Sequence, residues 1–278
     1  MIVVVGGTGR VGRQVVTQLT ESGLPVRSVT RGLNPGGLPS RAEVAQADLA
    51  DPASLEAHLQ DAQSLFLVWP FTSPEVTARL APKVAEIAAR HVSRIVYVSA
   101  QPAADRPDSF WALVERAIEE SGAEWTFLRP TGFAANTLMW ADQIRSGDVV
   151  RWPFGAAGRA LIDERDIASV AVRALTEDGH AGARYVLSGP EVLTQAEQLA
   201  AIGKAIGRAL TWEELPKQAA VEALAAAWGD AGFAETAVNT WERFVDHPET
   251  VTLAVSDITG APARRFADWA AANAAAFI

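Results

Sequence analysis

The sequence predicts an α/β fold, a doubly wound parallel sheet followed by a smaller C-terminal lobe. In the first half of the chain, apolar runs of strand length alternate with stretches of helical period, which is the pattern of repeated strand-helix-strand units. The strand segments are apolar almost throughout instead of alternating. That is typical of parallel strands covered by helices on both faces. Right-handed crossovers then produce the doubly wound arrangement.

The predicted elements follow in strict alternation up to Pro130. The segments that predict strands are IVVVG, PVRSVT, SLFLVWP, RIVYVSA and EWTFLRP. Helical periods predict helices over residues 11–22, 52–60, 74–91 and 109–121. A further strand is expected just before Asp48, in the segment QADLADPASL. The alternation therefore accounts for the N-terminal half without a long irregular connection.

Beyond Pro130 the alternation loosens. Gly and Pro interrupt the segment RWPFGAAGRA, RYVLSGP predicts a short strand, and an Ala-rich helical region covers residues 216–278. We predict one domain over residues 1–130, to whose sheet later segments return, and a mixed lobe over residues 131–278. Ala-rich stretches such as VEALAAAW are interpreted as packed helices and not as membrane-binding ones.

Composition restricts the kind of partner. The chain has 278 residues, enough for one large domain with a lobe, and its formal net charge of -9 argues against nucleic acids and anionic membranes. It has no Cys, and its four His show no metal-ligand spacing, so we expect neither disulfides nor a metal. No apolar run reaches the roughly 18 residues of a membrane span. Because the first strand begins at Ile2, we expect no signal peptide and a cytoplasmic protein.

The segment VVVGGTGRVGRQVV carries a glycine motif that fits two templates. Gly7, Gly9 and Gly12 form GxGxxG, whereas Gly6, Gly9 and Gly12 form GxxGxxG. In both, a strand ends in a tight turn that opens a helix, and the helix N-terminus faces a pyrophosphate. Glycine is required because a Cβ would block the approach of the phosphate. The expected cofactor contacts in this turn are Gly6, Thr8, Gly9, Arg10, Val11 and Gly12.

The end of the second predicted strand indicates which nucleotide binds. A site that prefers NAD usually places Asp or Glu there to bind the ribose 2′-OH, but this chain has VTRG. Arg31 would pair with a 2′-phosphate, and Arg10 adds a second cation. We therefore predict NADP(H), with a solvated loop charge as the alternative for Arg31. The missing carboxylate also counts against a methyltransferase. Asp48 would accept from the adenine amino group or cap its own loop.

Several segments together resemble the NmrA-like family of atypical short-chain dehydrogenases/reductases. They are GGTGRVG, Asp48-Leu49, ERAIEESGAEWTFLRPTGFAAN, LIDERDIASVAVRAL, YVLSGPEVLT and DITGAPARRFADWAAANAAAF, which cover essentially the whole chain. The resemblance implies a Rossmann domain that binds NADP(H), a smaller C-terminal substrate lobe and a cleft between them. Family members include proteins that look like quinone, azo or enone-type reductases, enzymes of natural-product pathways, and redox sensors without turnover.

The resemblance also assigns residues by position. It places Gly6, Gly9 and Gly12 at the pyrophosphate, Arg31 at the 2′-phosphate, and Asp48 and Leu49 at the adenine. Residues 68–70 and 99–100 would line the nicotinamide ribose, and residues 130–133 would lie over the nicotinamide. The cofactor contacts implied in these segments are Val68, Ser99, Pro130, Thr131 and Phe133.

The sequence departs from the wider superfamily around SFWALVER, residues 109–116. Reductases of that superfamily carry a Tyr and, four residues later, a Lys, but here Pro107 and Trp111 align with those positions. Without these residues, reduction suits acceptors that yield a low-energy anion and need little general acid catalysis, such as quinones and conjugated enones. Ser99 is the candidate proton donor, with water or a purely structural strand-end role as alternatives. Tyr97, inside RIVYVSA, is expected to pack in the core.

Aromatic side chains near the expected nicotinamide together favour a flat apolar pocket slightly, although any single one of them is better interpreted as a core residue. The predicted pocket residues are Trp69, Phe71, Phe110, Trp111, Phe133 and Trp140. Two functions follow as hypotheses. The first is an NADPH-dependent reductase of an apolar, aromatic or polycyclic quinone, enone, carbonyl or imine. The second is a non-catalytic NADPH-sensing scaffold. The expected partner is a small apolar molecule, with a homodimer as one open alternative for the assembly.

Overall fold

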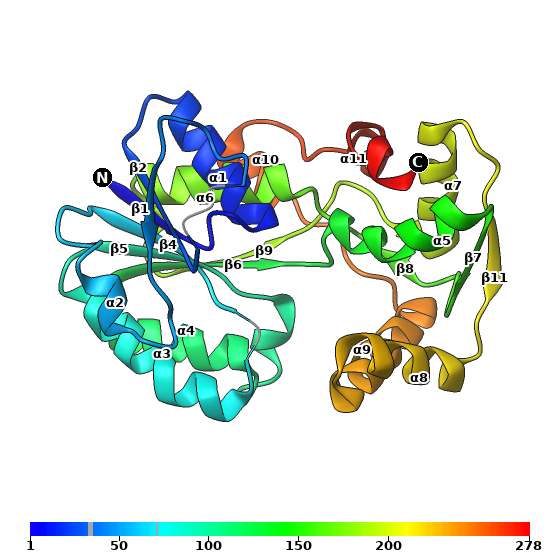
Figure 1. The fold of residues 1–278 in the computed structure, drawn as a ribbon, viewed down its shortest axis with the longest axis horizontal. Coiled ribbons are helices and arrows are strands. Elements are labelled where there is room, and N and C mark those ends of the chain that lie inside the picture. The colour runs from blue at the N-terminus through cyan, green and yellow to red at the C-terminus, as the bar shows by residue number, and fades with distance from the viewer. Residues whose placement is uncertain (33–35, 71) are drawn as a thin grey trace. The chain divides into compact units, whose positions relative to one another are not determined.

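The computed structural model describes residues 1–32, 36–70 and 72–278, and the chain divides into two compact units (Figure 1). Unit 1 comprises Met1–Pro130, Glu164–Leu187 and Ala254–Ala261, and unit 2 comprises Thr131–Asp163, Ser188–Leu253 and Pro262–Ile278. Two segments beyond residue 130 therefore fold with the N-terminal part of the chain.

Unit 1 is built on a seven-stranded sheet in the order β3-β2-β1-β4-β5-β6-β9. Every neighbouring pair in it is parallel. The strands are β1 (Ile2–Val5), β2 (Val26–Thr30), β3 (Glu43–Gln46), β4 (Ser64–Val68), β5 (Arg94–Val98), β6 (Glu124–Pro130) and β9 (Ala183–Leu187). The order reverses between β1 and β4, so the sheet is doubly wound and the predicted α/β class is confirmed.

Helices cover both faces of this sheet, with α1 and α6 on one side and α2, α3 and α4 on the other (Figure 1). The helices of unit 1 are α1 (Arg10–Glu21), α2 (Ala53–Glu56), α3 (Pro74–Ala89), η1 (Gln101–Ala104), α4 (Phe110–Glu120), α6 (Glu164–Thr176) and α10 (Ala254–Thr259). Helix α1 packs on α6, and α3 packs on α4. Strands β1, β4 and β5 are buried between these layers, which explains their continuous apolar sequence.

One predicted helix is much shorter than expected. The pattern predicts a helix over residues 52–60, but α2 ends at Glu56. The chain then continues in turns, in which His58 N–H donates to Leu55 and Leu59 N–H donates to Glu56, each over three residues. Leu55 and Leu59 are both fully buried. A tight turn therefore buries the same apolar residues that a regular helix would bury.

Unit 2 is a mixed lobe around an aromatic core. Its elements are η2 (Ala134–Trp140), α5 (Ala141–Ser146), β7 (Val149–Trp152), β8 (Gly158–Arg159), β10 (Leu193–Thr194), α7 (Gln195–Ile206), β11 (Thr211–Glu214), α8 (Lys217–Trp228), α9 (Ala231–Asp246), α11 (Phe266–Ala272) and η3 (Ala274–Phe277). Strand β7 pairs with β11, and β8 pairs with β10. The core contains Trp140, Trp152, Trp241 and Trp269. Among the described residues, no helix is long and apolar enough to span a membrane.

Candidate nucleotide site and substrate pocket

The glycine turn between β1 and α1 is closed by its own backbone. Gly6 has φ +85°, a left-handed conformation that favours glycine. Its carbonyl accepts from the Gly9 N–H at 2.9 Å. A Cβ on Gly12 would lie only 2.2 Å from that carbonyl oxygen, and a Cβ on Gly7 would lie 2.1 Å from Ser28 Oγ. The glycines therefore allow the first turn of α1 to pack directly against the end of β1.

The N-terminus of α1 has a glycine, which offers no side-chain cap, at its N-cap position. Gly9 occupies the N-cap position without a side-chain hydrogen bond, and the first turn has no acidic residue. The N-cap residue therefore provides no side-chain acceptor for the backbone N–H groups of this turn, and the helix dipole makes the same end positive. This arrangement fits a pyrophosphate, the group that such turns bind in dinucleotide-binding folds.

Arg13 supports this turn, although it is not among the predicted cofactor contacts. Its guanidinium donates to the Thr8 carbonyl at 3.2 Å through Nη2 and to the Gly36 carbonyl through Nη1. It therefore ties the glycine turn to the segment that follows β2. The spacing could have indicated Arg13, because it lies one helical turn after Arg10 and therefore on the same face of α1.

The two residues predicted to select the nucleotide differ in their surroundings. Arg31 is exposed directly after β2, and its carbonyl accepts from Gln46 Nε2 at 2.9 Å, which anchors its backbone to β3. Asp48 is also exposed, but its Oδ1 accepts from the Ala50 N–H at 2.9 Å. Asp48 thus caps its own loop, the second of the two predicted roles. The neighbouring Leu49 is buried in the core.

Val68 at the end of β4 is half-buried, whereas Ser99 after β5 and Pro130 at the end of β6 are buried. Val68 ends β4 next to the glycine turn, and a Cβ added to Gly6 would lie 3.1 Å from the Val68 Cβ. Ser99 follows β5 and is 3% exposed. In the described part of the chain its Oγ has no hydrogen-bond partner. Pro130 ends β6 and is buried. A buried hydroxyl without a protein partner requires another partner, such as a ligand or a water.

Tyr97 occupies a packing position. Its side chain is fully buried and contacts the Phe127 ring edge-on, with 6.2 Å between the ring centroids. Burial, and secondarily the charge of Glu115, raises the pKa of Tyr97 well above its usual value. A phenol with such a pKa stays protonated and is a poor acid near neutral pH.

The helix that lacks Tyr and Lys carries a different ionisable group. Ser109 caps α4 by accepting a hydrogen bond from the Ala112 N–H at 3.3 Å. The rings of Phe110 and Trp111 pack against each other, with 4.1 Å between their centroids. One turn further on, Glu115 is 4% exposed. Its carboxylate accepts two hydrogen bonds from Arg129 on β6, at 2.9 and 2.5 Å. This buried ion pair was not predicted.

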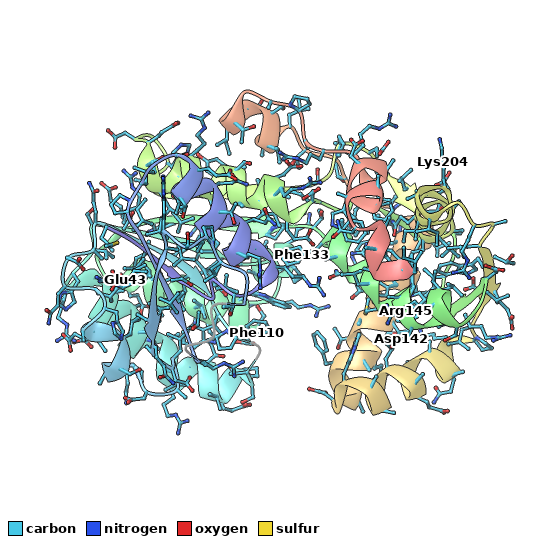
Figure 2. The ribbon with its side chains drawn as sticks, turned by 45° about the horizontal axis from the view of Figure 1, so that its top comes forward. Glu43, Phe110, Phe133, Asp142, Arg145 and Lys204 are labelled. Atoms are coloured by element: carbon cyan, nitrogen blue, oxygen red, sulfur yellow. The ribbon has the colours of Figure 1, made fainter. Side chains whose placement is uncertain are left out.

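The predicted aromatic pocket residues are divided between the two units. Trp69 packs in the core of unit 1. Phe110, on α4, also lies in unit 1, whereas Phe133 lies in unit 2 just before η2 (Figure 2). Trp140 is 2% exposed in unit 2. Phe71 lies outside the described residues. Thr131, predicted to contact the cofactor, is buried and donates to the Ala160 carbonyl at 2.7 Å.

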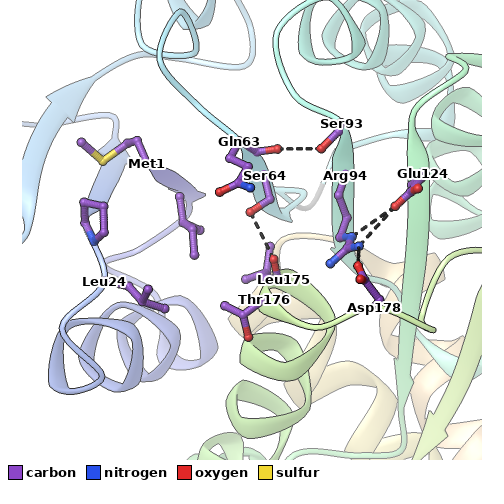
Figure 3. Close-up of a pocket in the computed structure, with 12 residues that line it drawn as sticks. Met1, Leu24, Gln63, Ser64, Ser93, Arg94, Glu124, Leu175, Thr176 and Asp178 are labelled. Atoms are coloured by element: carbon purple, nitrogen blue, oxygen red, sulfur yellow. Dashed lines mark hydrogen bonds and ion pairs between the residues drawn. The ribbon is translucent and has the colours of Figure 1, made fainter.

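A cavity of about 390 Å³ lies at the amino ends of β1, β4 and β5, at the edge of the sheet opposite to the glycine turn (Figure 3). Arg94 lies in it and forms ion pairs with Glu124 at 3.3 Å and Asp178 at 3.1 Å. Ligands of open α/β sheets bind at the carboxyl ends of the strands, so this cavity is not the nucleotide site. In the described ranges, no group of three His, Asp or Glu could hold a metal ion.

The sheet order, the glycine turn and the uncapped α1 define a dinucleotide-binding α/β protein of the Rossmann type. The model of the NmrA-like family matches residues 1–247. The chain therefore belongs to the NmrA-like family, which confirms the resemblance found in the sequence.

Curated relatives align over the full chain. One, a (4-alkanoyl-5-oxo-2,5-dihydrofuran-3-yl)methyl phosphate reductase from Streptomyces griseus, is 39% identical over 100% of this chain and 99% of its own length. Another, an NAD(P)H azoreductase from Xenophilus azovorans, is 35% identical over 100% and 99%. The crystal structure of an NADPH-dependent quinone oxidoreductase from Escherichia coli complexed with NADPH superposes with a TM-score of 0.82 at 24% identity, covering 98% of this chain and 99% of that one. That likeness shows the shared fold.

Proposed function

We propose that the protein is an NADPH-dependent reductase of an apolar, aromatic or polycyclic quinone, enone, carbonyl or imine. The observation that carries the proposal is the glycine turn, whose uncapped α1 N-terminus fits a pyrophosphate. Relatives at 39% and 35% identity that bear reductase names support it. In this proposal residues 1–130 bind NADP(H) and residues 131–278 bind the substrate.

The chain's own residues have distinct roles in this proposal. Gly6, Gly9 and Gly12 let the backbone approach the pyrophosphate, while Arg31 pairs with the 2′-phosphate. When bound, NADPH supplies the hydride. Ser99 Oγ, which is buried and lacks a partner among the described residues, donates a hydrogen bond to the acceptor oxygen as its charge grows. Water then supplies the proton. A quinone or enone suits this site because its anion needs little acid help.

Arg31→Asp should change the nucleotide preference. Removing the guanidinium and adding a carboxylate should weaken NADPH binding about 10- to 150-fold, because a charge-assisted hydrogen bond contributes roughly 1.5–3 kcal/mol. NADH should weaken by less than about threefold. Dissociation constants from nucleotide fluorescence titration check this, with Arg79→Asp on the exposed face of α3 as the charge-matched control. Equal losses for the two nucleotides would refute the assignment of Arg31.

The absence of the Tyr-Lys pair favours the sensor alternative. Measuring NADPH turnover distinguishes a reductase from a sensor. A reductase should oxidise NADPH when small quinones are added, which is followed as the loss of NADPH absorbance. A sensor should bind NADPH and change its assembly or partner affinity without consuming it. Tight NADPH binding with no oxidation across a panel of quinones, enones and imines would favour the sensor.

A further inference from the structure

Arg13 links the glycine turn to the connection between β2 and β3. It lies on α1. Its guanidinium donates through Nη2 to the Thr8 carbonyl at 3.2 Å and through Nη1 to the Gly36 carbonyl. Arg31, for which we propose the 2′-phosphate, lies at the start of the same connection, directly after β2. One side chain therefore joins the turn proposed for the pyrophosphate to the connection that carries the proposed 2′-phosphate contact.

Two glycines let the backbone of this connection approach the guanidinium. Gly36 has φ +50° and Gly37 has φ +85°, conformations that favour glycine. A Cβ on Gly37 would lie 2.9 Å from Arg13 Nη1, and one on Gly36 would lie 3.7 Å from Nη2. The contact therefore depends on glycine at residue 37 as well as on the arginine. These contacts join Thr8, Arg13, Gly36 and Gly37 into an arginine clamp.

The start of the connection is fixed independently of the clamp. The Arg31 carbonyl accepts from Gln46 Nε2 at 2.9 Å, and Thr30 Oγ1 donates to the Gly32 carbonyl. The backbone is thus anchored to β3 near Arg31 and to α1 at Gly36. A segment that is ordered before its ligand arrives costs less to bind, because its conformational entropy has already been lost in folding.

The positive charge of the clamp is not balanced by an acidic side chain. Among the described residues, Arg10, Arg13 and Arg31 take part in no ion pair, and the first turn of α1 has no acidic residue. The two carbonyls that Arg13 binds are neutral, so these bonds leave its charge uncompensated. In a chain with a net charge of -9, such a group of cations favours a dianion, the usual charge of a phosphate monoester.

We infer that Arg13 is a positioning residue that makes the protein selective for NADPH over NADH. The clamp holds the connection after β2 against the glycine turn and thereby keeps Arg31 in place for the 2′-phosphate. The inference rests on the proposed function, which assigns the glycine turn to the pyrophosphate and Arg31 to the 2′-phosphate. It deepens that proposal by naming a residue that selects the cofactor through its effect on Arg31.

Substitutions of Arg13 separate the geometry of the clamp from its charge. Arg13→Met should weaken NADPH binding about tenfold and NADH binding less than about threefold, because only NADPH uses Arg31. Arg13→Lys keeps the charge but loses the planar fork that reaches two carbonyls, so it should weaken NADPH nearly as much. Arg79→Met, on the exposed face of α3, is the matched control and should bind both nucleotides like the wild type. Fluorescence titration of the full chain measures the dissociation constants.

Gly37→Ala disrupts the clamp without changing any charge. The added Cβ would lie 2.9 Å from Arg13 Nη1, and the end of this flexible side chain would move away. NADPH binding should then weaken about tenfold and NADH binding less than about threefold. Gly23→Ala is the matched control, because Gly23 has a similar φ of +74° but a Cβ there would meet nothing within 4 Å. Gly37→Ala also tests the inference if thermal unfolding shows that Arg13→Met does not fold.

A double-mutant cycle with Arg31→Ala tests whether Arg13 acts through Arg31. In the Arg31→Ala background, Arg13→Met should change NADPH affinity by less than about threefold, because the contact that the clamp positions is already absent. A loss of about tenfold in both backgrounds would show that the two arginines act independently and would overturn the positioning role. Wild-type NADPH affinity in Arg13→Lys or Gly37→Ala would also overturn it, as would equal losses for the two nucleotides.

Failure of this inference differs from failure of the proposed function. Binding of both nucleotides and quinone-dependent oxidation of NADPH are measured on the same preparations. If the wild type oxidises NADPH while the clamp variants keep its preference for NADPH over NADH, the inference is wrong and the reductase stands. If the clamp variants lose that preference but the wild type oxidises no NADPH, the inference holds and the reductase is refuted. A wild type that does not bind NADPH would overturn both.

Discussion

Gly12→Val should raise the dissociation constant for NADPH by about 100-fold or more. The added Cβ would lie 2.2 Å from the Gly6 carbonyl oxygen and 3.0 Å from Gly7 Cα. Both obstacles are backbone atoms, so the clash can be relieved only by moving the turn away from α1. The N–H groups that we propose for the pyrophosphate would move with it, and a loss of roughly 3 kcal/mol corresponds to that factor. Fluorescence titration of NADPH measures the constant.

Gly147→Ala is the matched control for this substitution. Gly147 has an extended φ of 177°, and a Cβ there would meet nothing within 4 Å. Its NADPH affinity should therefore equal that of the wild-type protein. If Gly12→Val bound NADPH within about threefold of the wild type, the turn would not be the pyrophosphate site.

Glu115→Gln should lower the free energy of unfolding by about 3–5 kcal/mol, the usual cost of breaking a buried ion pair on one side. The Glu115 side chain is 6% exposed and the Arg129 side chain 13% exposed, so the unpaired guanidinium would stay largely buried. Hydrogen bonding to Glu115 raises the pKa of Arg129 above its usual value in the wild-type protein. Because a guanidinium keeps its proton in proteins even without such a partner, Arg129 cannot relieve the strain in the variant by losing its proton. Urea denaturation followed by circular dichroism measures the difference.

Two comparisons isolate the effect of burial. Glu119 lies on the same helix and pairs with Arg184, but those side chains are 32% and 41% exposed. Glu119→Gln should therefore cost less than about 1 kcal/mol. The double variant Glu115→Gln/Arg129→Met should recover much of the lost stability, because it also removes the orphaned charge. Equal costs for Glu115→Gln and Glu119→Gln would show that the pair on α4 contributes no more than a surface contact.

The sequence was sufficient for the parts of this protein that depend on local pattern. Parallel strands buried on both faces must be apolar along their length, so β1, β4 and β5 were recognisable from short segments. The glycine turn was equally readable, because Gly6, Gly9 and Gly12 act within a few residues of one another. Helix α2 was overestimated, since buried leucines four residues apart fit a helix and a tight turn equally well.

The tertiary structure decided the features that depend on distant partners. Glu115 reads as an ordinary charged residue of an amphipathic helix until β6 brings Arg129 to it. Likewise, Arg159 is neutralised by Glu249, which lies 90 residues away in the sequence. Burial and charge pairing depend on which segments the fold brings together. The sequence by itself therefore determined the fold class and the glycine turn, whereas the electrostatics of the buried groups followed only from the tertiary structure.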